Sequence, residues 1–329
     1  MRIGGDAAPT RNKALVSPDL AGILAEIAAR GLGTPDPALN SIAVARAGNE
    51  AYFKAIAEPR VEVHSVSVMA AVASDGFHVP VKVVVPLGVK TNAPAMLYCH
   101  GGGYAFGDIN THDHVMRALA TATGLVVCGV DYRRTPEVTF PVPLEDALAA
   151  LQAMRDRPWA NQFHYNPGKI VIAGDSAGAH LCLALMLVLR ERGLPQVQGA
   201  ALIYGMYARR YDSWSHHAYG DGSFGLSSEK MRWLWDQLIP ERPFDDAQFA
   251  ESIDAYLAGL PPLALFAAEC DCLLDDTLSF LETCKRQNHP HSFDLFKGAT
   301  HGFMQLSSVY QGTRDAMAVV ARRLTALVG

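Results

Sequence analysis

Two stretches of helical periodicity precede every strand pattern in the chain. Apolar residues recur at helical spacing over residues 18–30 and again over 42–56. Ser17 and Pro18 mark the start of the first helix, because serine caps a helix and proline suits its first turn. Helices that come before any strand do not belong to the core of a sheet. We therefore expect residues 1–60 to contribute helices to a cap.

From about residue 61 the pattern changes to strands that alternate with helices. Valines at 61, 63, 66 and 68 and at 79, 81, 83 and 85 predict two half-buried strands, at 61–68 and 79–85, with a turn at Ser74-Asp75-Gly76 between them. Further apolar runs predict strands at 95–99, 125–130, 170–173, 199–204, 263–267 and 292–296. Helical patterns lie between or after them at 114–123, 144–155, 180–190, 276–286 and 309–327. Continuous apolar strands alternating with helices argue for a mostly parallel sheet covered on both faces.

The alternation stops between about residues 206 and 257. This stretch is rich in aromatic residues, charges and glycine, and we interpret it as an insertion between two strands. We expect tryptophans such as Trp233 and Trp235 to form the core of the insertion rather than to contact substrate, since large aromatics dominate cores. The predicted division is cap helices at 1–60, a catalytic domain at 61–205 and 258–329, and a cap insertion at 206–257.

A serine lies where a buried strand meets a long apolar helix. Residues 174–178 read Gly-Asp-Ser-Ala-Gly, after the apolar run 170–173. G-x-S-x-G in a strand–turn–helix context is the nucleophile elbow of an α/β-hydrolase. Its glycines let the strand and helix backbones approach where a Cβ would clash, and the helix points its positive end at Ser176.

A glycine-rich loop, His100-Gly101-Gly102-Gly103, follows the predicted strand at 95–99. Successive glycines leave backbone N–H groups uncovered, so a carbonyl oxygen can approach them closely. Beside the nucleophile this loop predicts an oxyanion hole, completed by the N–H of Ala177. A phosphate-binding loop would need a lysine and a serine or threonine opening a helix, and these are absent. We expect His100 to be structural and to orient the loop.

The serine needs a base, and the base needs an acid that fixes its tautomer. His301 lies in the last loop before the last helix, where the order Ser, acid, His of this fold puts the base. The acid has several candidates after the strand at 263–267, among which composition does not choose: Glu269, Asp271, Asp275 and Asp276. Loop position favours Asp271, whereas the last two suit the first turn of the next helix, where negative charge complements the dipole.

Other polar clusters predict no further chemistry. His112, Asp113 and His114 could suggest a metal site, but on a helix start two residues apart they face different directions, so we expect them to serve capping and to lie at the surface. Cys270 and Cys272 form a C-x-C without a second ligand pair at zinc-site spacing, so we interpret them as ordinary thiols.

These motifs together resemble the hormone-sensitive-lipase branch of the α/β-hydrolases, the carboxylesterases with an HGGG loop. The resemblance runs from about Pro94 onward and includes His100–Tyr104, Asp131-Tyr132-Arg133, Leu144-Glu145-Asp146, the elbow at 174–178 and His301-Gly302-Phe303. It implies an α/β-hydrolase fold with a mostly parallel eight-stranded sheet and a helical cap. It also implies a site with Ser176 as nucleophile, His301 as base, Asp271 as acid, and Gly102, Gly103 and Ala177 as the oxyanion hole.

Composition limits the kinds of partner that we expect the protein to bind. The net charge is −5 without a basic run, which disfavours nucleic acid, and the longest apolar run, residues 181–189, is too short to span a bilayer. No signal peptide is visible, and the six scattered cysteines make a reduced cytoplasm the expected location. We expect no metal and no organic cofactor.

The expected function is a serine carboxylic-ester hydrolase that forms an acyl-enzyme on short-chain, medium-chain or aryl esters. An amidase, or a hydrolase of aryl amides, carbamates or lactones, would keep the same triad, because the acyl-enzyme is shared. A non-catalytic receptor for a small ligand is disfavoured because His301 is present. The resemblance also implies a possible homodimer through the last strand.

Overall fold

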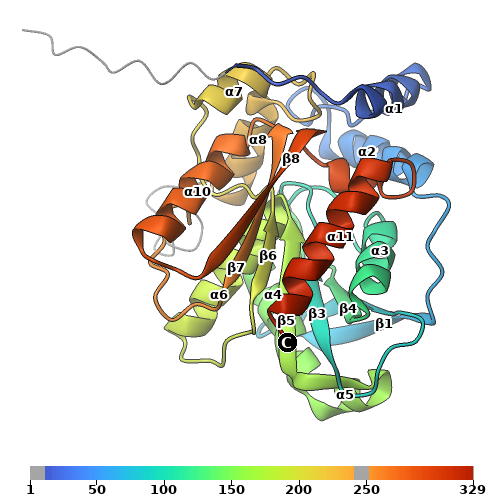
Figure 1. The fold of residues 1–329 in the computed structure, drawn as a ribbon, viewed down its shortest axis with the longest axis vertical. Helices are drawn as coiled ribbons and strands as arrows, with labels where there is room; N and C mark the ends of the chain where they lie inside the picture. The colour runs from blue at the N-terminus through green and yellow to red at the C-terminus, as the bar shows by residue number, and fades with distance from the viewer. Residues whose placement is uncertain (1–11, 241–251, 329) are drawn as a thin grey trace, which may run out of the picture.

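One eight-stranded sheet organises the computed structural model, which describes residues 12–240 and 252–328 (Figure 1). The strand order is β1-β2-β4-β3-β5-β6-β7-β8. The β1–β2 and β2–β4 pairs are antiparallel, and every other neighbouring pair is parallel. The predicted α/β-hydrolase fold with a mostly parallel sheet is therefore confirmed. The strands are β1 Ser65–Val72, β2 His78–Val85, β3 Ala93–Cys99, β4 Val126–Val130, β5 Tyr165–Asp175, β6 Ala200–Ile203, β7 Leu263–Cys270 and β8 His291–Thr300.

Helices cover both faces of this sheet. They are α1 Pro18–Ala29, α2 Ile42–Ile56, α3 Asp113–Thr123, α4 Val142–Arg155, α5 Arg157–Phe163, α6 Ala177–Glu191, α7 Trp214–Tyr219, α8 Ser228–Leu238, α10 Leu274–Arg286 and α11 Gln311–Ala326, with a 3₁₀ helix η1 at Phe303–Leu306. Alternate residues of β3 point to opposite faces: Leu97 joins the core under α4, α6 and α10, and Met96 joins the core under α3 and α11. The sheet is therefore buried on both sides, as its apolar strands predict.

The structure corrects the sequence prediction at two places. The first strand begins at Ser65 rather than at residue 61, because its partner β2 ends at Val85, which faces Ser65. The short helix α5 was not expected, since its seven residues are too few to show a helical period.

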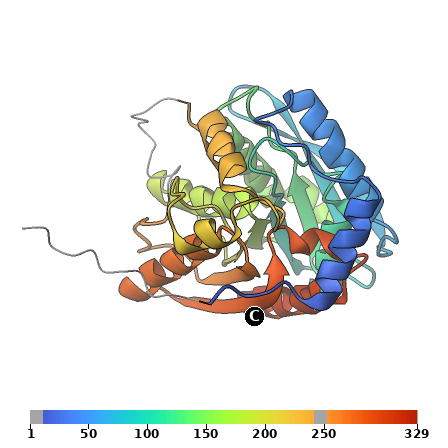
Figure 2. The same ribbon diagram turned by 90° about the horizontal axis from the view of Figure 1, so that it is seen from above.

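Helices α1, α2, α7 and α8 gather at the end of the sheet where the parallel strands finish (Figure 1). Seen from above, the blue N-terminal helices lie on one side of that end and the gold α7 and α8 lie on the other (Figure 2). Residues 1–11 and 241–251, which fall in the two segments predicted to form the cap, lie outside the described residues. Within residues 12–240 and 252–328, no helix is both long enough and apolar enough to cross a membrane.

Candidate active site

Ser176 stands in a strained turn between β5 and α6. Its backbone has φ 54° and ψ −118°, a positive-φ conformation that residues other than glycine rarely adopt. The turn depends on its two glycines. A Cβ on Gly174 would collide with the carbonyl of Gly178, and a Cβ on Gly178 would collide with the carbonyl of Cys99. Local sterics thus explain the sequence pattern and hold the Ser176 side chain at the end of the sheet.

Ser176, His301 and Asp271 form one hydrogen-bonded chain. Nε2 of His301 lies 3.0 Å from Oγ of Ser176, and Nδ1 lies 2.7 Å from Oδ2 of Asp271. The three residues follow β5, β8 and β7, so the ends of three parallel strands bring together positions that are far apart in sequence. The Asp271 side chain is fully buried, whereas 12% of the His301 side chain is exposed. An imidazole held in this way can accept a proton from Oγ while the carboxylate holds its other N–H.

The other candidate carboxylates have different partners. Oε2 of Glu269 accepts the N–H of Gly298 at 2.8 Å, and Oδ2 of Asp275 accepts the N–H of Ser215 at 2.9 Å. Asp276 is buried and accepts the N–H of Tyr207 at 2.9 Å, and its burial raises the pKa of the carboxyl to about 7. Asp275 and Asp276 do lie in the first turn of α10, but they also accept the backbone N–H groups of Tyr207, Ala208 and Ser215.

The glycine loop after β3 presents two backbone N–H groups. Gly102 and Gly103 have φ 113° and φ 60°, so the chain turns sharply here. Their N–H groups donate no hydrogen bond to any residue in the described part of the chain. Ala177 is the first residue of α6, where helix N–H groups have no partner within the helix. Gly102 and Gly103 line the cavity described below, so the N–H groups that the sequence predicts as oxyanion-hole donors include two that face it.

Asp175 is a site residue that the sequence analysis did not single out. Its Oδ1 accepts the hydroxyl of Tyr98 at 2.5 Å and the N–H of Gly101 at 2.9 Å, and its Oδ2 accepts the hydroxyl of Tyr204 at 3.3 Å. Burial, together with the Asp175 charge, raises the pKa of both tyrosines well above its usual value, so both remain donors. The buried carboxylate thus ties the glycine loop to the elbow. The sequence does place this charged residue at the end of a buried strand, and a buried charge needs hydrogen-bond partners, which could have marked Asp175 as important.

The expectation that His112, Asp113 and His114 lie at the surface was wrong. All three side chains are buried. The ring of His112 lies 5.1 Å from that of His100, and Nε2 of His114 donates to the Gln305 carbonyl at 2.7 Å. The start of α3 is covered by η1, a tertiary contact that helical periodicity alone does not reveal.

His100 itself packs beneath the glycine loop. It stacks on Tyr132 with ring centroids 4.2 Å apart, and its Nδ1 lies 2.8 Å from the Gly101 carbonyl. Burial lowers the pKa of His100 to about 3, so its ring is neutral and Nδ1 can donate to that carbonyl.

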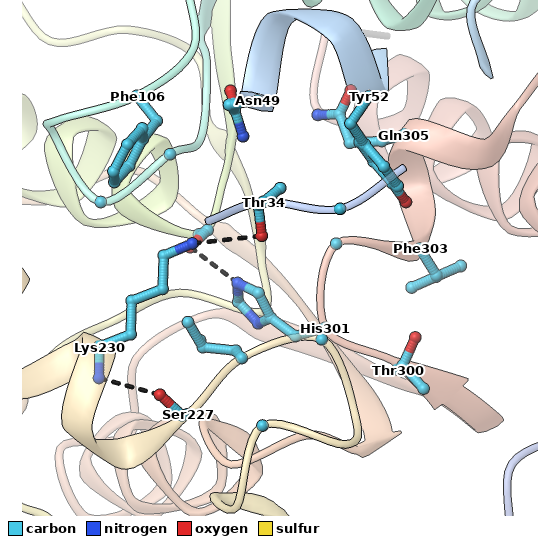
Figure 3. A pocket seen from close by; sticks show the side chains of 18 of the residues that line it. Thr34, Asn49, Tyr52, Phe106, Ser227, Lys230, Thr300, His301, Phe303 and Gln305 are labelled. Atoms are coloured by element: carbon cyan, nitrogen blue, oxygen red, sulfur yellow. Dashed lines mark hydrogen bonds between the residues drawn. The ribbon is translucent and has the colours of Figure 1, made fainter. Parts of the chain in front are cut away.

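A cavity of about 510 Å³ opens onto Ser176 and His301 (Figure 3). Its lining comes from α1 and α2, from the glycine loop, from α8 and the turn before it, and from the loop after β8. Tyr52, Phe106 and Lys230 belong to this lining. Nothing in the sequence pattern of α8 distinguishes a lysine over a cavity from one in solvent, so the sequence alone predicts no role for Lys230. Residues 12–240 and 252–328 contain no cluster of His, Cys, Asp or Glu side chains suited to a metal ion. All six cysteines are buried free thiols.

A strained serine elbow, a glycine loop beside it and a His–Asp pair at the ends of parallel strands define the α/β-hydrolase class. Residues 96–305 match the Abhydrolase_3 family, described as an alpha/beta hydrolase fold, and the chain belongs to that family. This match confirms the resemblance to the hormone-sensitive-lipase branch.

Solved structures agree over nearly the whole chain. A hyperthermophilic esterase from the archaeon Pyrobaculum calidifontis superposes with a TM-score of 0.86 at 29% identity, covering 95% of this chain and 99% of that one. An ester hydrolase from the metagenome of Lake Arreo, complexed with a bipyridine phosphonate derivative, has a TM-score of 0.86 at 26% identity, covering 95% and 99%. A thermostable esterase from Pseudomonas putida shares the fold, with a TM-score of 0.86 at 23% identity over 98% and 99%.

Proposed function

We propose that the protein is a serine carboxylesterase in which Ser176, His301 and Asp271 act as nucleophile, base and acid. The observation that carries this proposal is the hydrogen-bonded chain Ser176–His301–Asp271 at the cavity, with its 3.0 Å and 2.7 Å contacts. A serine hydroxyl is a poor nucleophile until an adjacent base removes its proton, and this arrangement supplies that base. The solved esterases of similar structure support an ester as substrate.

The proposed reaction proceeds through an acyl-enzyme. Oγ of Ser176 attacks the ester carbonyl carbon as Nε2 of His301 takes the hydroxyl proton. The resulting oxyanion accepts hydrogen bonds from the N–H groups of Gly102, Gly103 and Ala177. His301 then gives its proton to the departing alkoxide, and the alcohol leaves. Water attacks the acyl-enzyme by the same steps and releases the acid.

The cap and the cavity support a small substrate. We infer that residues 1–60 and 206–257 form the cap over a catalytic domain of 61–205 and 258–329, since the cavity lining includes both α1–α2 and α8. A cavity of about 510 Å³ is in the range of drug-sized ligands, which favours short or medium acyl chains or an aryl group.

Hydrolysis of p-nitrophenyl esters from acetate to laurate, with an anilide series alongside, tests the proposal. We expect turnover that is greatest with short or medium chains. Ser176→Ala should lose several orders of magnitude in kcat. Ser74→Ala, in the exposed β1–β2 turn, is a matched loss of one hydroxyl and should retain the activity.

Retained turnover in Ser176→Ala would refute the nucleophile. Activity on anilides without activity on esters would make the protein an amidase with the same triad, and activity on neither series would contradict the proposed function.

A further inference from the structure

Lys230 reaches into the cavity from the helix that covers it. Ser227, Lys230, Met231 and Leu234 all line the cavity, and their spacing places them on one face of α8. Figure 3 shows the long Lys230 side chain extending toward Thr34, which comes from the segment between α1 and α2. The lysine thus brings a cation into the space that a substrate of Ser176 would occupy.

The Lys230 ammonium group has few partners in the protein. Nζ donates one long hydrogen bond, 3.4 Å to Oγ1 of Thr34, and lies 5.0 Å from the centre of the Phe106 ring. Asp36 also lines the cavity, but its Oδ1 accepts the N–H of Ala38 at 2.9 Å. Within residues 12–240 and 252–328, no carboxylate forms an ion pair with Lys230. An ammonium group has three N–H donors, so donors remain for a ligand.

Burying the Lys230 ammonium group without a counter-ion is unfavourable, so binding an anion beside it would be favourable. Burial lowers the pKa of Lys230 to about 8, although the nearby charge of Asp36 acts to raise it. The group is therefore mostly protonated at neutral pH, and the residue is partly buried. Charge-assisted hydrogen bonds are strongest in such places, whereas a lysine exposed to solvent gains little from an ion pair.

We propose that Lys230 binds a carboxylate on the substrate, so that the preferred ester carries a negative charge in addition to its scissile bond. This inference rests on the proposed function, because the anion must share the cavity with Ser176. One ammonium group and the Thr34 hydroxyl suit a singly charged carboxylate. A phosphate dianion would be better matched by an arginine fork or by several cations. The carboxylate can belong to either the acyl or the alcohol part of the ester.

Paired esters that differ only in this charge test the proposal. On the acyl side, monoethyl glutarate is compared with ethyl glutaramate, and on the alcohol side para-acetoxybenzoate is compared with para-acetoxybenzamide. The measured quantity is the ratio of kcat/KM for the charged ester to that for its neutral analogue. In Lys230→Met we expect this ratio to fall about tenfold or more in one of the two pairs, as for the loss of one charged hydrogen bond. Lys230→Arg keeps the charge and should retain most of the ratio.

A matched control separates local recognition from overall charge. Lys285→Met removes an exposed lysine of α10 that pairs with Glu282 and lies outside the cavity lining, so the ratio should not change. If Lys230→Met lowers kcat/KM equally for the charged and neutral members of both pairs, the lysine only tethers α8 to Thr34 and the inference fails.

Binding without turnover keeps this inference distinct from the proposed function. Calorimetric titration of Ser176→Ala with monoethyl glutarate and, separately, with para-acetoxybenzoate should give, for at least one of the two, a Kd that adding Lys230→Met weakens about tenfold. An unchanged Kd for both compounds in the double variant, together with an unchanged kinetic ratio in both pairs, overturns the role of Lys230. Absence of all ester turnover in the wild-type enzyme would instead count against the proposed function, while the titration still decides the role of Lys230.

Discussion

Replacing Asp271 by asparagine reverses the polarity of one hydrogen bond and preserves the shape of the side chain. The asparagine oxygen can keep the 2.8 Å bond from the N–H of Leu273, which the aspartate accepts through Oδ1. Its NH₂ group then faces Nδ1 of His301, which must become an acceptor. The ring proton moves to Nε2, which lies 3.0 Å from Oγ of Ser176, and the imidazole can no longer take the serine proton.

The expected loss is large in rate and small in stability. In Ser-His-Asp triads the wrong tautomer lowers kcat by about 10⁴, which corresponds to about 5 kcal/mol of transition-state stabilisation. The free energy of unfolding should fall by no more than about 3 kcal/mol, since one charge-assisted hydrogen bond is lost and the packing is unchanged.

The assay is steady-state hydrolysis of p-nitrophenyl acetate near neutral pH, with urea denaturation of the same samples. Glu269→Gln is the matched control, because it also neutralises a carboxylate of this segment, one that binds the N–H of Gly298. We expect the control to lose less than about tenfold in kcat. The reasoning is refuted if Asp271→Asn stays within about tenfold of wild type, or if Glu269→Gln loses as much as Asp271→Asn.

Two further predictions concern buried polar side chains around the glycine loop and at the start of α3. Asp175→Ala removes the acceptor for two close buried donors, the Tyr98 hydroxyl and the Gly101 N–H, and for the more distant Tyr204 hydroxyl. The free energy of unfolding in urea should therefore fall by about 2–6 kcal/mol, and a change below about 1 kcal/mol would contradict that role. Burial lowers the pKa of His100 to about 3 and that of His114 to about 4, against 6.5 normally. Between these values and about 6.5 the unfolded chain binds protons at these two histidines that the folded chain does not, so their contribution to stability should fall as pH drops from about 6.5 to 4; the raised pKa of Asp276, about 7, contributes with the opposite sign. His114→Gln should flatten this slope in urea midpoints, and an unchanged slope would show that burial of His114 does not contribute to acid sensitivity.

The parts of the site that sequence predicts well are those with a local steric demand. Gly174 and Gly178 flank a serine at positive φ, and any Cβ at either position would collide with backbone atoms. The motif can therefore be recognised from the sequence alone. The meeting of His301 with Ser176 likewise follows from the topology of a parallel sheet, whose strand ends lie at one edge.

The parts that sequence predicts poorly depend on tertiary contact. Val61 fits the two-residue period of a strand, yet it lies before β1, because β2 offers no partner beyond Val85. His112 and His114 have the sequence positions of surface residues at a helix start, but both are buried: His112 packs against the His100 ring, and His114 donates to the Gln305 carbonyl in η1. The position of Lys230 in an amphipathic helix is ordinary, and only the tertiary structure shows that its face of α8 lines the cavity.

Covalent capture of Ser176 tests whether its oxygen attacks the substrate. Diethyl p-nitrophenyl phosphate should phosphorylate an activated serine, with release of p-nitrophenolate and formation of an Oγ–P bond. We expect one diethylphosphoryl group per chain in the intact mass, on the peptide that contains Ser176, and none on Ser176→Ala under the same conditions. A label on another residue, or equal labelling of Ser176→Ala, would contradict it.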